Sequence, residues 1–116
     1  MNLKAAYAAL LDAARSQTTV SYTDIIHAAG LTLSGDALSG ALGRLFYDIV
    51  QAELAQNPDA PMLSAIALPK DGNRPSKGFF DLARELGRLG STLPKDEDAF
   101  WVNEMNKVYA YWRSNE

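Results

Sequence analysis

The residue types that most often do chemistry in proteins are scarce in this 116-residue chain. No cysteine occurs, which excludes disulfides, thiolate metal sites and a cysteine nucleophile. The only histidine, His27, has apolar neighbours on both sides, which is typical of a structural or surface histidine and not of a general base. Asp96, Glu97 and Asp98 are adjacent, so they do not converge on one ion, and acids already interact favourably with a helix start. The sequence therefore predicts no catalytic residue, no metal site and no cofactor.

Positive charge is concentrated in one segment of an acidic chain. The formal net charge is -3 and the pI is near 5.1, which argues against strong non-specific binding to nucleic acid. Residues 67–88 nevertheless carry five bases against three acids. The loop in this segment, which is rich in Gly and Pro, contributes Lys70, Arg74 and Lys77. We expect any contact with DNA phosphates to use these three side chains.

Two further arginines, Arg84 and Arg88, follow the loop four residues apart and share one face of an expected helix. They can extend the positive strip of the loop onto that helix. Alternatively, they form ion pairs within the helix with Asp81 and Glu85, as charged surface helices usually do. The sequence leaves both arrangements open.

Apolar residues at helical spacing, separated by caps and by Gly or Pro, divide the chain into elements. Asn2 and Ser21 are suitable N-caps, and Gly30 can end a helix because it adopts a left-handed backbone without steric cost. The first half is predicted to contain a helix over 2–17, an extended segment over 18–21, and helices over 22–29 and 36–55. The second half is predicted to contain a buried strand over 62–68, a loop over 69–78, a helix from 79 and a terminal helix from 96.

The helices over 22–29 and 36–55, joined by a turn at 30–35, have the layout of a helix-turn-helix motif. Two helices that merely pack at a corner are the alternative. Because a strand and a basic loop follow, we expect 1–116 to form one mostly helical α+β domain, like a winged helix-turn-helix with an added C-terminal helix. Its second helix offers Ser39 and Arg44 but no Asn or Gln in its first three turns, which is poor for reading bases.

Four stretches occur in order between residues 19 and 80: VSYTDIIHAAGL, ALGRLF, NPDAPMLSAIAL and DGNRPSKGFF. Together they resemble the winged-helix domain of the alkylguanine-DNA alkyltransferases and their alkyltransferase-like relatives. In that family a VSY-type segment opens the first helix of the motif, and an NP-containing turn leads to the active-site strand. The resemblance implies that Tyr22 presses on a backbone phosphate and that Arg44 supports distortion of the DNA.

The sequence departs from that family at its reactive motif, Pro-Cys-His-Arg, whose thiolate accepts the alkyl group. The corresponding stretch, around 64–68, contains neither Cys nor His. Alkyl transfer to this chain is chemically impossible, so the chain is predicted not to be an enzyme. The resemblance still allows the chain to bind a DNA lesion without repairing it. Such binding requires a pocket and a positively charged helical face.

The predicted function is that of a non-enzymatic module that contacts double-stranded DNA. The expected contact residues are Tyr22, Ser39, Arg44, Lys70, Arg74 and Lys77. A competing class is a protein-interaction or inhibitory domain of a bacterial or phage system that does not bind DNA. A small hydrolase or nuclease is a third class, which carboxylates clustered beside His27 would support.

The terminal helix is rich in aromatic residues. Its expected core-facing stripe consists of Trp101, Met105, Val108 and Trp112. Partly exposed aromatic residues remain on its other faces, where they suit a protein partner or a homodimer better than duplex DNA. These expected interface residues are Phe100, Tyr109 and Tyr111. Simple burial against the first helix is the alternative.

The N-terminal segment lacks the continuous apolar region of a signal peptide. No apolar run approaches the roughly 20 residues that a membrane-spanning helix needs. We therefore expect a cytoplasmic protein that makes no contact with a membrane.

Overall fold

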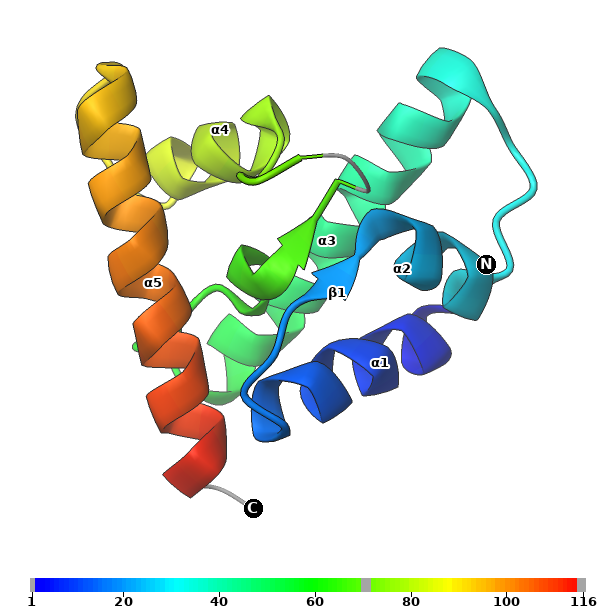
Figure 1. The fold of residues 1–116 in the computed structure, drawn as a ribbon, viewed down its shortest axis with the longest axis horizontal. Helices are drawn as coiled ribbons and strands as arrows, with labels where there is room; N and C mark the ends of the chain where they lie inside the picture. The colour runs from blue at the N-terminus through cyan, green and yellow to red at the C-terminus, as the bar shows by residue number, and fades with distance from the viewer. Residues whose placement is uncertain (1, 70–71, 115–116) are drawn as a thin grey trace.

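The computed structural model describes residues 2–69 and 72–114. In this part of the chain, five α-helices and one short 3-10 helix surround a pair of two-residue strands (Figure 1). The elements are α1 (Leu3–Arg15), β1 (Val20–Ser21), α2 (Tyr22–Ala29), α3 (Gly35–Gln56), the 3-10 helix η1 (Leu63–Ile66), β2 (Ala67–Leu68), α4 (Lys77–Glu85) and α5 (Pro94–Ser114). The prediction of a mostly helical α+β protein is confirmed.

The helix caps expected from the sequence are present at the first two helices. The Asn2 side chain accepts a hydrogen bond from the backbone N–H of Ala5 at 3.0 Å, and Ser21 Oγ accepts one from Asp24 at the same distance. At the end of α2, Gly30 adopts φ 71°, a left-handed conformation that favours glycine. Helix α2 therefore stops where the sequence predicts, and the chain turns toward α3.

The run 62–68 departs from the predicted strand. Leu63–Ile66 form η1, and only Ala67–Leu68 are extended, paired in parallel with Val20–Ser21. The prediction is wrong for 63–66 because a fully buried run that is apolar except for one serine carries no periodicity that distinguishes a helix from a strand. In the described residues β2 leads toward α4 and no strand returns beside it, so a β-hairpin wing is not confirmed.

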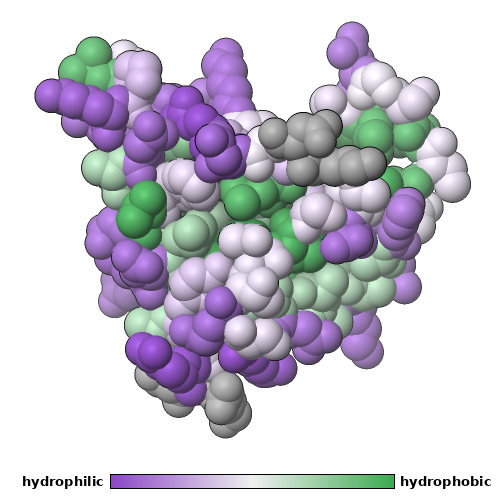
Figure 2. Space-filling model, in the orientation of Figure 1, coloured by the Kyte–Doolittle hydropathy of each residue, from purple (hydrophilic) through white to green (hydrophobic). Residues whose placement is uncertain are grey.

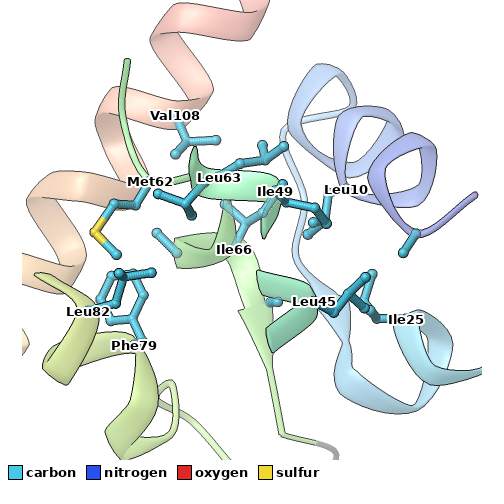
Figure 3. Packing of buried hydrophobic residues seen from close by; sticks show 14 of the residues in the cluster. Leu10, Ile25, Leu45, Ile49, Met62, Leu63, Ile66, Phe79, Leu82 and Val108 are labelled. Atoms are coloured by element: carbon cyan, nitrogen blue, oxygen red, sulfur yellow. The ribbon is translucent and has the colours of Figure 1, made fainter. Parts of the chain in front are cut away.

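The hydrophobic core is organised around η1, which packs against α1, α3 and α5. Leu63 and Ile66 of η1 are fully buried at the centre of the cluster shown in Figure 3. Each surrounding helix contributes buried side chains, among them Leu10, Ile25, Leu45, Ile49, Phe79, Leu82 and Val108. Because η1 is enclosed on several sides, its sequence is apolar at nearly every position.

Helix α5 runs along one side of the molecule, as Figure 1 shows, and packs on α1 and η1. Val108 is fully buried, and Trp101 donates a hydrogen bond from Nε1 to the carbonyl oxygen of Ala65 at 2.9 Å. Met105 and Trp112 are partly buried against the same core, so the predicted stripe faces inward. Glu104 is also buried on this face, which the sequence analysis did not anticipate.

Candidate binding site

A cavity of about 500 Å³ lies between α3 and α4; we call it the α3–α4 cavity. Its two sides are lined by residues four apart, Ser39, Gly43 and Tyr47 on α3 and Lys77, Asp81 and Glu85 on α4. The four-residue spacing places each set on one face of its helix. Figure 2 shows the surface in the orientation of Figure 1. Hydrophobic residues, in green, and pale residues lie in the middle of this face, and hydrophilic residues, in purple, lie at its margins.

Aromatic side chains form much of the cavity wall. Tyr22 and Phe46 both line it, and their ring centroids lie 5.4 Å apart in a tilted arrangement. Phe79 also lines it and packs edge to face against Phe80 at 5.1 Å. Aromatic rings favour such tilted and edge contacts, so these walls can accept a further flat ring.

Tyr22 is held by the segment that opens α4. Its Oη accepts a hydrogen bond from the backbone N–H of Ser76 at 3.1 Å and lies 3.2 Å from Ser76 Oγ. This contact joins the start of α2 to the start of α4, 54 residues later in the chain. Tyr22, which the sequence assigns to a DNA phosphate, is thus a half-buried part of the cavity wall.

Two cations remain exposed on or beside the cavity. The Arg44 side chain is 71% exposed, and its Nε lies 3.0 Å from Asp48 Oδ1, one turn later on α3. Lys77 is exposed at the start of α4 and makes no ion pair or side-chain hydrogen bond within residues 2–69 and 72–114. Of the predicted DNA-contact residues, the structure therefore gathers Tyr22, Ser39 and Lys77 around one cavity and places Arg44 next to its lining.

Arg74, another predicted contact residue, faces α5 instead. Its Nη2 lies 3.0 Å from Asp98 Oδ1 and 3.3 Å from Glu97 Oε1. Its guanidinium carbon also lies 4.9 Å from the centre of the Phe80 ring. Lys70 lies outside the described residues. Of the two described cations of the basic loop, Lys77 therefore lines the cavity and Arg74 does not.

Arg84 and Arg88 also face α5. Arg84 pairs with Glu97, donates to the carbonyl oxygen of Ser91 at 2.9 Å, and lies 3.4 Å from Asp81. The pairing of Arg84 with Asp81 within α4 is thus confirmed. Hydrogen bonding from Arg84 is the main reason that the pKa of Glu97 is held below its ordinary value, with a further contribution from Arg74.

Arg88 pairs with neither Asp81 nor Glu85, so that prediction is wrong: α4 ends at Glu85, and Arg88 lies beyond it, after Gly87 with φ 76°. Its Nη1 lies 3.0 Å from Oε2 of Glu104, which is 2% exposed. The same oxygen accepts a hydrogen bond from the backbone N–H of Met62 at 2.9 Å. Arg88 pairs with Glu104 instead because α5 brings this buried carboxylate within reach of the segment that follows α4. We call the whole set of contacts the α5 seam: Arg74, Arg84 and Arg88 with Glu97, Asp98 and Glu104.

The three predicted partner-interface residues are all half-buried. The Phe100 ring centroid lies 6.0 Å from that of Phe79, and the Tyr111 ring packs edge to face against Trp112 at 5.1 Å. Burial raises the pKa of Tyr109. A homodimer through these residues stays a prediction.

Two groups of site residues were missed by sequence analysis. Ser64 and Ser76 line the cavity, and a single hydroxyl within an otherwise apolar run was a signal for Ser64. Glu104 was detectable from its spacing, because it lies three residues after Trp101 and four before Val108, on the predicted buried stripe.

Within residues 2–69 and 72–114, no three His, Asp or Glu side chains are grouped so that they could hold a metal ion. In the same described ranges, no helix combines the length and apolarity that a membrane span requires. Comparison with known proteins gave no match to a family model, to a curated protein or to a solved structure.

Proposed function

We propose that this chain is a non-enzymatic binding module that recognises a protein partner through the α3–α4 cavity. The observation that carries the proposal is the cavity itself, in which α2, α3, η1 and α4 all contribute lining side chains. Binding sites are typically concave and mostly apolar, with a few polar groups that fix the orientation of the ligand. Here the walls are aromatic and aliphatic, and the polar groups are hydroxyls and three charged side chains.

The charges around the cavity favour a peptide over a polyanion. Three lining residues are charged at neutral pH: Asp81 and Glu85 are acidic, and Lys77 is basic. The arginines of the α5 seam, which lie in the same basic segment, are already paired with carboxylates. A polymer of phosphates would meet two acids at this surface, whereas a peptide of mixed charge can complement both signs.

Contact with double-stranded DNA is the second candidate function, favoured by the exposed start of α3. Ser39, Gly40 and Gly43 are exposed there, next to the exposed Arg44. In a winged helix-turn-helix arrangement α3 would be the helix that meets the duplex. Small side chains allow close approach to a phosphate backbone, and Arg44 and Lys77 would supply the positive charge.

A matched pair of substitutions tests the first function. Gly43→Leu adds a side chain at the cavity lining, and Gly40→Leu adds the same side chain three residues earlier on α3, where the residue does not line the cavity. Both glycines are exposed, and a Cβ at either position meets no atom within 4 Å apart from its chain neighbours and the backbone of its own helix, so both variants are expected to fold. Peptides selected by display on the folded chain should bind about tenfold more weakly to Gly43→Leu and equally well to Gly40→Leu.

Two outcomes would count against this function. Selected peptides that bind both variants equally would place the protein contact elsewhere on the molecule. A fluorescence-anisotropy titration in which the chain binds a DNA duplex, with a salt dependence that Lys77→Ala and Arg44→Ala each reduce, would establish the second candidate in its place.

A further inference from the structure

The α3–α4 cavity contains a buried hydroxyl group. Ser64 lines the cavity from η1 and is 4% exposed. Its Oγ has no hydrogen-bond partner within the described residues. The oxygen exposes less than 1 Å² of surface. Because buried polar side chains are almost always hydrogen-bonded, a rotation about the Cα–Cβ bond that turns this hydroxyl toward a polar group in the cavity would give it a partner.

The walls above Ser64 suit an aromatic ring. Tyr22, Phe46, Tyr47 and Phe79 all contribute to the lining. A ring held between them would gain tilted or edge contacts of the kind that already joins Tyr22 to Phe46. Among protein side chains, tyrosine and tryptophan combine such a ring with a polar atom at its outer part, whereas phenylalanine has none.

The charged residues on the α4 side of the cavity are acidic, apart from Lys77 at the start of the helix. Asp81 lies 3.4 Å from Arg84, which partly neutralises it. Glu85 is exposed and makes no ion pair or side-chain hydrogen bond in the part of the chain that the structure describes. A basic residue next to the inserted ring would therefore find complementary charge along this side, away from Lys77.

We propose that the cavity receives one tyrosine or tryptophan side chain of a protein partner, with the polar atom of that ring bonded to Ser64 Oγ. A lysine or arginine near it in the partner sequence would lie against Glu85. The inference rests on the proposed function and names the anchor residue that such a partner needs. Tyrosine, tryptophan and arginine are the residues that most often dominate protein interfaces, and the rings of tyrosine and tryptophan supply a large contact area at low conformational-entropy cost.

The test uses three amino-acid amides as probes: N-acetyl-tyrosinamide, N-acetyl-tryptophanamide and N-acetyl-phenylalaninamide. Binding is followed through the backbone amide NMR signals of Gly78 and Leu82, which line the cavity and are present in every variant used. All three probes should shift these signals in the wild type and in Gly40→Leu, and none should do so in Gly43→Leu. Ser64→Ala should weaken the binding of the tyrosine and tryptophan probes about fivefold and leave the binding of the phenylalanine probe unchanged.

Ser64→Ala removes a hydroxyl that has no partner, so the variant is expected to fold. If it weakens all three probes equally, or none of them, the bond to Ser64 is refuted. Binding that persists in Gly43→Leu would locate the probes outside the cavity and would overturn the proposal.

Two further measurements separate this inference from the proposed function. Adenosine and guanosine are titrated in the same way, and nucleosides that shift the same signals at lower concentrations than the amides would refute a protein side chain as the natural occupant. Selected peptides that bind at the cavity but contain no tyrosine or tryptophan would refute the anchor alone. Amides that bind when no peptide can be selected would support the ring site and contradict the proposed function.

Discussion

The side of α4 that faces α5 and the side that faces α3 differ in what their charged residues contact. Toward α5, Arg84 and Arg88 pair with Glu97 and Glu104, and Arg88 and Glu104 approach to 3.0 Å. Toward α3, Lys77 and Glu85 line a cavity and make no ion pair within the described residues. Charged residues close together in sequence thus pair with α5 on one side, whereas Lys77 and Glu85 on the other side have no ion-pair partner among the described residues.

The helical repeat separates these two roles. Lys77, Asp81 and Glu85 recur every four residues, which keeps them on one face of α4. Arg84 lies three residues after Asp81 and projects toward α5. Arg88 lies beyond the end of α4, after Gly87 with φ 76°, and reaches α5 from the segment that follows the helix. The four bases of segment 67–88 that the structure describes are therefore not one positive surface. Substitutions on the two sides should have different consequences, largest where a charge is buried.

The largest effect is expected at the buried end of the α5 seam. Glu104→Ala leaves the Arg88 guanidinium and the backbone N–H of Met62 without their shared acceptor. Breaking a buried pair by removing one member typically costs about 3 kcal/mol, so the free energy of unfolding should fall by about that amount. Urea denaturation followed by tryptophan fluorescence measures it. Asn103→Ala, an exposed change on the same helix, is the control, and equal losses in both variants would contradict the structural role of Glu104.

A smaller effect, measured as a change in the pH dependence of stability, is expected at Glu97. Its pKa is lowered in the folded protein, mainly by hydrogen bonding from Arg84, so its ionised form stabilises the fold above the ordinary pKa. That contribution is lost as the pH falls through the lowered pKa. Between about pH 5 and pH 3, Glu97→Gln should therefore lose less stability than the wild type.

Glu85→Gln, on the cavity side, is the matched control for this pH dependence. Because Glu85 has no partner among the described residues, its substitution should leave the acid profile of the wild type unchanged. Urea denaturation at each pH measures both variants. Identical profiles for Glu97→Gln and the wild type would show that the seam does not depend on the charge of Glu97.

The smallest effects are expected for two cations, Arg74, which faces α5, and Lys77, which lines the cavity. Arg74→Ala removes a partly exposed ion pair with Asp98 and should lower the free energy of unfolding by about 0.5 kcal/mol. Lys77→Ala removes no ion pair, so thermal denaturation should give the wild-type midpoint. If the DNA candidate is correct, Lys77→Ala also weakens duplex binding and Arg74→Ala does not. The reverse result would mean that Arg74 leaves Asp98 to contact phosphate.

Local features were the most predictable part of this fold. Asn2, Ser21 and Gly30 act at their helix ends as the sequence predicts, because capping depends on atoms within a few residues. The apolar stripe of α5 was also predictable from helical spacing. The 3-10 helix η1 was not, since its residues are buried on all sides and its apolar run has no period.

The candidate site was predictable only in part. Tyr22, Ser39 and Lys77 were expected at one surface and do line one cavity, but the roles of Arg74 and Arg88 depend on α5, which joins them from later in the chain. The sequence alone could not decide whether a basic residue would meet a neighbour on its own helix or a carboxylate from another element.

The amino-acid sequence by itself determined the helical class, the helix ends and the absence of cysteine chemistry, because each depends on residue type and short spacing. Only the tertiary structure decided which charges are paired and which remain free. Whether a side chain is buried, and which group it meets there, depends on the packing of elements that are distant in sequence. Ser64 illustrates this, because its hydroxyl becomes a candidate ligand contact only when α3 and α4 enclose a cavity beside η1.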